Sequence, residues 1–127
     1  MLLWNNLSFG FKFTDFKKTS YIEIEQAGIW IKQNSNPGDL IITESKPQNI
    51  YYSDRDSINF EEVNKTGGTF EEGIQKLKPK YLILSLIERS SDWAYLYPQN
   101  NSQLIPVYAY PENSQQPVLI IYQFKYN

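Results

Sequence analysis

The sequence contains no cysteine and no histidine. Without cysteine it can form no disulfide, no thiolate nucleophile and no zinc–sulfur site. Without histidine it lacks the commonest general acid or base and the commonest metal ligand. Any catalysis would fall to Asp, Glu, Lys, Tyr or Ser. The sequence therefore predicts a domain with no cofactor, no metal and no set of residues that catalyses a reaction by itself.

An excess of basic charge and a long apolar run are also missing. The net charge is −2, from 12 basic and 14 acidic residues scattered along the chain. Nucleic-acid binding needs a basic stripe, so we expect no nucleic-acid partner. No run of about 18 apolar residues is present, so no predicted helix spans a bilayer. A length of 127 residues is typical of one hydrophobic core.

Alternating helix and strand signals begin at Ser20. Ser20 and Glu23 form a capping-box pair that predicts a helix start, and Pro37 follows its predicted end. We interpret residues 1–19 as an irregular or juxtamembrane lead-in and residues 20–127 as one domain. The predicted helices span residues 20–34, 47–52 and 70–77, and the predicted strands span 40–43, 58–60, 81–87, 104–110 and 118–124.

This order of elements predicts an α/β fold. Strands that alternate with helices favour a parallel sheet with right-handed crossovers. The last two strands are joined by a short polar loop, which predicts an antiparallel hairpin. We therefore expect a mixed, mainly parallel sheet of about five strands with helices packed on it, in a three-layer, Rossmann-like arrangement.

Aromatic residues make up 16% of the sequence and include an alternating set, Trp93, Tyr95 and Tyr97. In an extended conformation these three rings would project from one side. Flat rings in a row can stack on sugars or lie among lipid headgroups. Core packing explains them equally well, so the set is a candidate carbohydrate- or membrane-facing site with a structural alternative.

Three other motifs have more ordinary explanations. Asp54-Arg55-Asp56 offers a carboxylate pair that suits a divalent metal, but a three-residue match also fits a solvated turn, which we favour. Thr66-Gly67-Gly68-Thr69 lacks the lysine of a phosphate-binding loop and fits a flexible connection. Three Asn-x-Ser/Thr sequons begin at Asn6, Asn64 and Asn100, and short triplets of this kind also arise by chance.

A longer set of residues resembles a known family. The set comprises Ala27-x-x-Trp30-Ile31-Lys32-x-Asn34, Gly38-Asp39 before an apolar strand, Tyr51-Tyr52-Ser53-x-Arg55, Lys78-Pro79-x-Tyr81-Leu82-Ile83-Leu84, Val107-Tyr108-x-Tyr110 and Ile121-Tyr122. It resembles the C-terminal soluble domain of polytopic membrane glycosyltransferases. This group includes dolichyl-phosphate-mannose–protein mannosyltransferases and 4-amino-4-deoxy-L-arabinose transferase-like proteins of archaea and bacteria. Asp54 stands where the family often has glycine.

The resemblance implies a location and a set of partners. The domain would lie on the extracytoplasmic side of the cell membrane, anchored through a transmembrane region that precedes this sequence. That membrane-embedded part of the same polypeptide would hold the catalytic acids and the polyprenyl-phosphate sugar. The domain would then be non-catalytic and would help to recognise or position a glycan or protein acceptor.

The motif residues themselves have structural interpretations. We expect Trp30 and Ile31 to anchor the first helix on the sheet, and Tyr51 and Tyr52 to pack the short helix against the first strand. Arg55 is expected to cap carbonyl groups at the end of that short helix.

Three hypotheses about function follow. The first is the non-catalytic glycosyltransferase domain described above. The second is a free-standing carbohydrate-binding or protein-interaction module that uses Trp93, Tyr95 and Tyr97. The third is a small Rossmann-like enzyme acting on a nucleotide, which would need a deep pocket lined by Asp or Glu at the carboxyl ends of the strands.

Overall fold

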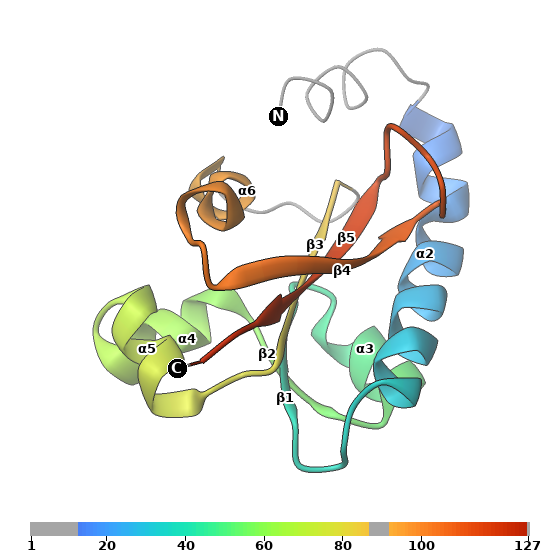
Figure 1. The fold of residues 1–127 in the computed structure, drawn as a ribbon. Coiled ribbons are helices and arrows are strands. Elements are labelled where there is room, and N and C mark those ends of the chain that lie inside the picture. Colours follow the sequence, from blue (N-terminus) through green and yellow to red (C-terminus); the bar gives the residue numbers. More distant parts are fainter. Residues whose placement is uncertain (1–12, 87–91, 127) are drawn as a thin grey trace.

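The computed structural model describes residues 13–86 and 92–126 (Figure 1). The helices are α2 (Phe13–Gln33), α3 (Lys46–Ser53), α4 (Phe60–Gly67), α5 (Phe70–Leu77), α6 (Asp92–Leu96) and the 3₁₀ helix η1 (Tyr97–Asn100). The strands are β1 (Leu40–Ile42), β2 (Asp56–Ile58), β3 (Tyr81–Ser85), β4 (Leu104–Tyr110) and β5 (Leu119–Phe124). Within these ranges, no helix combines the length and the apolarity needed to cross a lipid bilayer.

One five-stranded sheet has the order β2-β1-β3-β5-β4. β1 pairs in parallel with β2 and with β3, whereas β5 pairs antiparallel with β3 and with β4. The prediction of a mainly parallel sheet was wrong. β1 and β2 have three residues each while β4 and β5 have seven and six, so the longer ladders are antiparallel. The C-terminal hairpin was predicted correctly, and the Rossmann-like description stays a prediction.

Helices cover both faces of the sheet (Figure 1). On one face, α2 supplies Ala27 and Ile31 to a cluster with Ile41, Ile83 and Ile121. On the other face, α4, α5 and α6 pack on the strands in a second cluster, whose buried members are Ile42, Phe60, Val63, Phe70, Ile74, Leu82, Leu84, Ala94, Leu104 and Phe124. Successive residues of β3 alternate between the two clusters, because neighbouring side chains of a strand point to opposite faces.

The long helix α2 differs from its prediction at one end. It begins at Phe13, so Ser20 lies inside the helix and the predicted capping box at Ser20 was wrong. Its other end was predicted well, because Asn34 turns back and donates from both its backbone and its side-chain nitrogen to the Trp30 carbonyl, at 3.0 and 2.8 Å. Ile31 is fully buried, and the Trp30 ring meets Tyr81 edge-on at 5.2 Å. These two residues anchor α2 on the sheet as expected.

Helix α4 was missed in the sequence. Residues 58–60 were predicted to be a strand, but β2 ends at Ile58 and Phe60 begins α4. The deciding interaction is a capping box, in which Asn59 Oδ1 accepts from Glu62 N at 2.9 Å and Glu62 Oε1 accepts from Asn59 N at 3.0 Å. The next helix, α5, has the predicted bounds and the predicted Thr69 cap.

Candidate functional site

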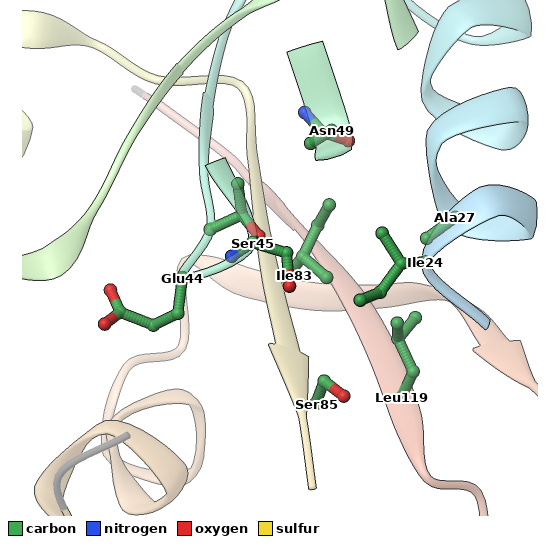
Figure 2. Close-up of a pocket in the computed structure, with 9 residues that line it drawn as sticks. Ile24, Ala27, Glu44, Ser45, Asn49, Ile83, Ser85 and Leu119 are labelled. Atoms are coloured by element: carbon green, nitrogen blue, oxygen red, sulfur yellow. The ribbon is translucent and has the colours of Figure 1, made fainter. Parts of the chain in front are cut away.

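A narrow crevice opens where β1 and β3 end at their carboxyl termini. The chain leaves β1 through α3 to reach β2 on one side, and returns through α4 and α5 to β3 on the other side. This reversal makes the β1–β3 edge the topological switch point, where open α/β sheets usually bind ligands. The crevice has a volume of about 10 Å³ and is lined by Ile24, Ala27, Thr43, Glu44, Ser45, Asn49, Ile83, Ser85 and Leu119 (Figure 2).

Asn49 is the most unusual side chain of this crevice. It lies on α3 and is only 1% exposed. Its Nδ2 donates to Ser57 Oγ at 2.8 Å, whereas its Oδ1 accepts no hydrogen bond from the part of the chain that the structure describes. An unpaired buried carbonyl costs about 1–3 kcal/mol, so Asn49 supplies an acceptor that favours a hydrogen-bond donor in the crevice.

Two other polar side chains that follow β1 accept hydrogen bonds from backbone amides. Thr43 Oγ1 accepts from Ser45 N at 3.0 Å. Glu44 Oε2 accepts from Phe60 N at 3.0 Å and so supports the start of α4. No three acidic side chains cluster as a metal-binding group within residues 13–86 and 92–126. The crevice therefore offers hydrogen bonds to a very small polar group, and its one carboxylate is engaged in fixing a helix.

The third hypothesis required a deep pocket at this place. The crevice has the expected position and contains one glutamate, Glu44. Its volume of about 10 Å³ matches a single water molecule, whereas a nucleotide needs a pocket of several hundred Å³. The geometry therefore does not support a nucleotide site here.

Arg55 makes a dense hydrogen-bond network just before β2, at the end of the sheet opposite the crevice. Its guanidinium donates to the Lys32 and Ser35 carbonyls at 3.2 and 3.1 Å, to Ser35 Oγ at 2.9 Å and to the Asp54 carbonyl at 3.0 Å. Arg55 was expected to cap carbonyls at the end of α3; it bonds one there, that of Asp54, while the other two belong to Lys32 in the last turn of α2 and to Ser35 just after that helix. Arg55 thus links the turn between α3 and β2 to the end of α2.

The predicted aromatic set is helical rather than extended. Trp93 and Tyr95 lie on α6 and Tyr97 begins η1. The prediction that all three rings project from one side was wrong. Tyr95 donates from its hydroxyl to the Ser85 carbonyl at 3.1 Å, whereas the Trp93 and Tyr97 rings both pack on Phe70, each with ring centroids 5.0 Å away. Trp93 still keeps 40% of its surface exposed.

Tyr97 is held at its polar end as well. Its hydroxyl donates to Glu71 Oε1 and accepts from Asn101 Nδ2 at 2.9 Å. Burial, with the Glu71 carboxylate as a second cause, raises the pKa of Tyr97 well above its ordinary value of 10.0. The phenol is therefore a neutral hydrogen-bond donor that joins η1 to α5.

The remaining motif residues have structural positions. Asp54 ends α3 with a left-handed backbone at φ 59° and is exposed, as a solvated turn predicts, whereas Asp56 is exposed but begins β2 instead of lying in a turn. Gly68 ends α4 at φ 87°, a conformation that favours glycine. Tyr52 is half-buried, but Tyr51 is 80% exposed, so the expected packing of Tyr51 was wrong.

Comparisons with known proteins give one informative result. The sequence matches no protein-family model and no curated protein. Among solved structures, the chain is similar to the C-terminal globular domain of an oligosaccharyltransferase from Archaeoglobus fulgidus. The TM-score is 0.52 at 8% sequence identity, over 80% of this chain and 95% of that one. The two share a fold.

The likeness to the oligosaccharyltransferase domain spans nearly all of that domain. At 8% identity it shows the fold alone, and no role of an individual residue can be carried over to this chain.

The residues that line the crevice were not identified as a site from the sequence. Thr43, Glu44 and Ser45 directly follow a predicted buried strand, and that position is the signal that could have identified them.

Proposed function

We propose that this chain is the non-catalytic globular domain of a membrane-bound glycosyltransferase that uses a polyprenyl-phosphate-linked sugar. The domain lies on the extracytoplasmic side, is anchored through a transmembrane region of the same polypeptide, and helps to recognise or position the acceptor. The observation that carries this proposal is the fold likeness to the globular domain of an oligosaccharyltransferase over 80% of this chain. The sequence resemblance to glycosyltransferase soluble domains points the same way.

The chemistry of the crevice supports the non-catalytic part of the proposal. A glycosyl transfer needs an acid or base placed against the reacting groups. Glu44, the one acid that lines the crevice, instead supports the start of α4 through its Oε2, and Tyr97, which lies outside the crevice, is kept neutral by burial and by Glu71. The polar side chains at the switch point stabilise loops and helix ends. They fit a rigid domain that presents a surface to a partner.

Two experiments test the proposal. An antibody raised against this chain is used on fractionated cells of the source organism. We expect the antigen in the membrane fraction, at a mass far above the 14.9 kDa of this chain, and accessible to protease added outside intact cells. In the second experiment, the purified chain is incubated with a polyprenyl-phosphate sugar and an acceptor peptide, and we expect no transfer. A protein that remains soluble inside the cell, or transfer by the isolated chain, would overturn the proposal.

The acceptor-positioning role has its own measurement. In the full-length transferase, removal of residues 20–127 should raise KM for the acceptor and leave KM for the lipid-linked donor nearly unchanged, because the donor binds elsewhere. Equal changes in both constants would count against acceptor positioning.

The free-standing binding module remains the second candidate because Trp93 is 40% exposed. Of the predicted set Trp93, Tyr95 and Tyr97, it is Trp93 that would face a carbohydrate or a membrane in this alternative. A glycan titration followed by tryptophan fluorescence separates the two functions. A saturable response that disappears in Trp93→Ala would favour the module, and no response would favour the glycosyltransferase domain.

A further inference from the structure

The segment formed by α6 and η1 has one exposed side that the proposed function does not explain. Leu96, where α6 ends, keeps a right-handed helical backbone at φ −88° and ψ −18°, so the helical path continues into η1. Trp93 and Leu96 are 40% and 48% exposed, whereas Ala94 between them is 1% exposed. Asn100 is also exposed. Because residues three apart share a side of an α-helix, Trp93 and Leu96 line one exposed strip of α6, and Asn100 lies at the end of the 3₁₀ helix η1 that continues from it.

Asn100 begins a sequon, Asn100-Asn101-Ser102, on the surface of the domain. The sequon lies at the end of η1 and in the turn before β4, and both Asn100 and Ser102 are exposed. The middle residue holds the turn, because Asn101 Nδ2 donates to Tyr97 and Asn101 Oδ1 accepts from Gln103 N at 2.8 Å. The amide and the hydroxyl that an N-glycosylating enzyme must reach are therefore both open to solvent.

The second sequon in the described residues has a poorer geometry. Asn64 is half-buried inside α4, and its carbonyl accepts from Gly68 N at 2.8 Å. The hydroxyl of Thr66 donates to the Glu62 carbonyl at 2.8 Å. An enzyme would have to unwind α4 to use this site. The third sequon, at Asn6, lies outside the described residues.

We propose that Asn100 carries an N-linked glycan whose innermost sugars lie along Trp93 and Leu96. The glycan would cover two exposed apolar side chains, and the face of an indole ring suits the apolar face of a pyranose. This inference rests on the proposed extracytoplasmic location, where glycan attachment takes place. It assigns an occupant to the exposed strip and a use to one of the three sequons.

The attachment reaction transfers an oligosaccharide from a lipid carrier to the Asn100 side chain. The Asn100 side-chain nitrogen forms a bond to the anomeric carbon of an oligosaccharide carried on a polyprenyl phosphate or diphosphate. The bond between that carbon and the phosphate oxygen breaks, and the lipid phosphate leaves with the electron pair. One amide proton passes to a base of the attaching enzyme. The co-reactant is thus a lipid-linked oligosaccharide, and no oxidant or metal of this chain is needed.

The test uses the protein purified from membranes of its source cells, with glycopeptides identified by mass spectrometry. We expect a glycan on the peptide that contains Asn100. Asn100→Gln and Ser102→Ala should both lose it, whereas Ser102→Thr restores a sequon and should keep it. Asn64→Gln is the matched control and should leave the Asn100 glycan unchanged. An unmodified Asn100 in protein that protease reaches from outside the cell overturns this inference and leaves the proposed function intact.

A second measurement tests the contact with Trp93. Asn100→Gln removes the glycan. It should raise the acrylamide quenching constant of the most accessible tryptophan fluorescence by at least about twofold. The same removal in a Trp93→Phe background should have no such effect. Glycosylated protein in which the quenching of Trp93 is unchanged by Asn100→Gln would overturn the contact. Protection of the whole domain from external protease would instead overturn the proposed function, and with it this inference.

Discussion

A methyl group added at Gly73 tests how closely α4 and α5 pack. A Cβ at this position would lie 2.1 Å from the Val63 carbonyl oxygen and 2.7 Å from Val63 Cγ1. The first contact is with backbone and cannot be relieved by a rotamer change. Alanine is the better helix former by about 1 kcal/mol, so propensity alone predicts that Gly73→Ala stabilises the protein. The close packing of α4 and α5 predicts instead that Gly73→Ala destabilises the protein.

We expect the packing to dominate. Overpacking a well-filled site typically costs about 1–3 kcal/mol, and the helix pair can relax only by moving apart. With the gain in helix propensity subtracted, and because the clash is with backbone, we expect Gly73→Ala to lower the free energy of unfolding by about 1–2 kcal/mol. An unfolding entropy of about 2.1 cal/mol/K per residue then lowers Tm by about 4–7 °C for this length of chain.

The assay is urea unfolding followed by circular dichroism and tryptophan fluorescence. Gly38→Ala is the matched control, because nothing lies within 4 Å of a Cβ at Gly38. The control should be neutral or slightly stabilising, since alanine restricts the unfolded chain. If Gly73→Ala were as stable as the unchanged protein, the close approach of α4 and α5 would be refuted.

Three further predictions concern hydrogen bonds. Arg55→Lys should lower the free energy of unfolding by about 1–3 kcal/mol, measured in urea, because lysine cannot bond the carbonyls of Lys32 and Ser35 and the Ser35 hydroxyl together. Because the pKa of Tyr97 is raised, the folded state keeps a proton that the unfolded state releases, so stability should fall as pH rises above 10.0; Tyr97→Phe should make this alkaline fall less steep in urea titrations at several pH values. A crystal structure should show one ordered water within hydrogen-bonding distance of Asn49 Oδ1, because the crevice of about 10 Å³ admits one.

Much of the fold follows from local patterns in the sequence. Thr69 and the apolar spacing after it define α5, and the continuous apolar run at Tyr81 defines the strand that is buried on both faces. The C-terminal hairpin also follows from alternation and a polar loop. These elements were predictable because a single short window contains both the cap or turn and the buried residues that stabilise the element.

The errors arose where two local signals competed. Ser20 and Glu23 form a good capping pair, but the helix continues through them from Phe13. Asn59 and Glu62 form an equally good pair, and there the helix does begin. Spacing alone could not separate the two cases.

The aromatic set shows a different difficulty. Trp93, Tyr95 and Tyr97 alternate in sequence, which is a strand signal. The same residues contain Trp93 and Tyr97 at a spacing of four, which is a helix signal, and both rings find the same partner, Phe70, on α5. The local pattern fits a strand and a helix equally well. Contact with Phe70, which is distant in sequence, favours the helix.

The residues after β1 could be located from the sequence, but the complete crevice could not, because it depends on the order of the strands. β5 lies between β3 and β4, and the reversal after β2 places β3 beside β1. That arrangement brings Asn49, Glu44 and Ser85 to one crevice at the edge of the sheet. The sequence lists these side chains far apart and gives no distance between them. Of the three, Glu44 has a structural task that the sequence gives no sign of, because its Oε2 accepts from the Phe60 amide at the start of α4.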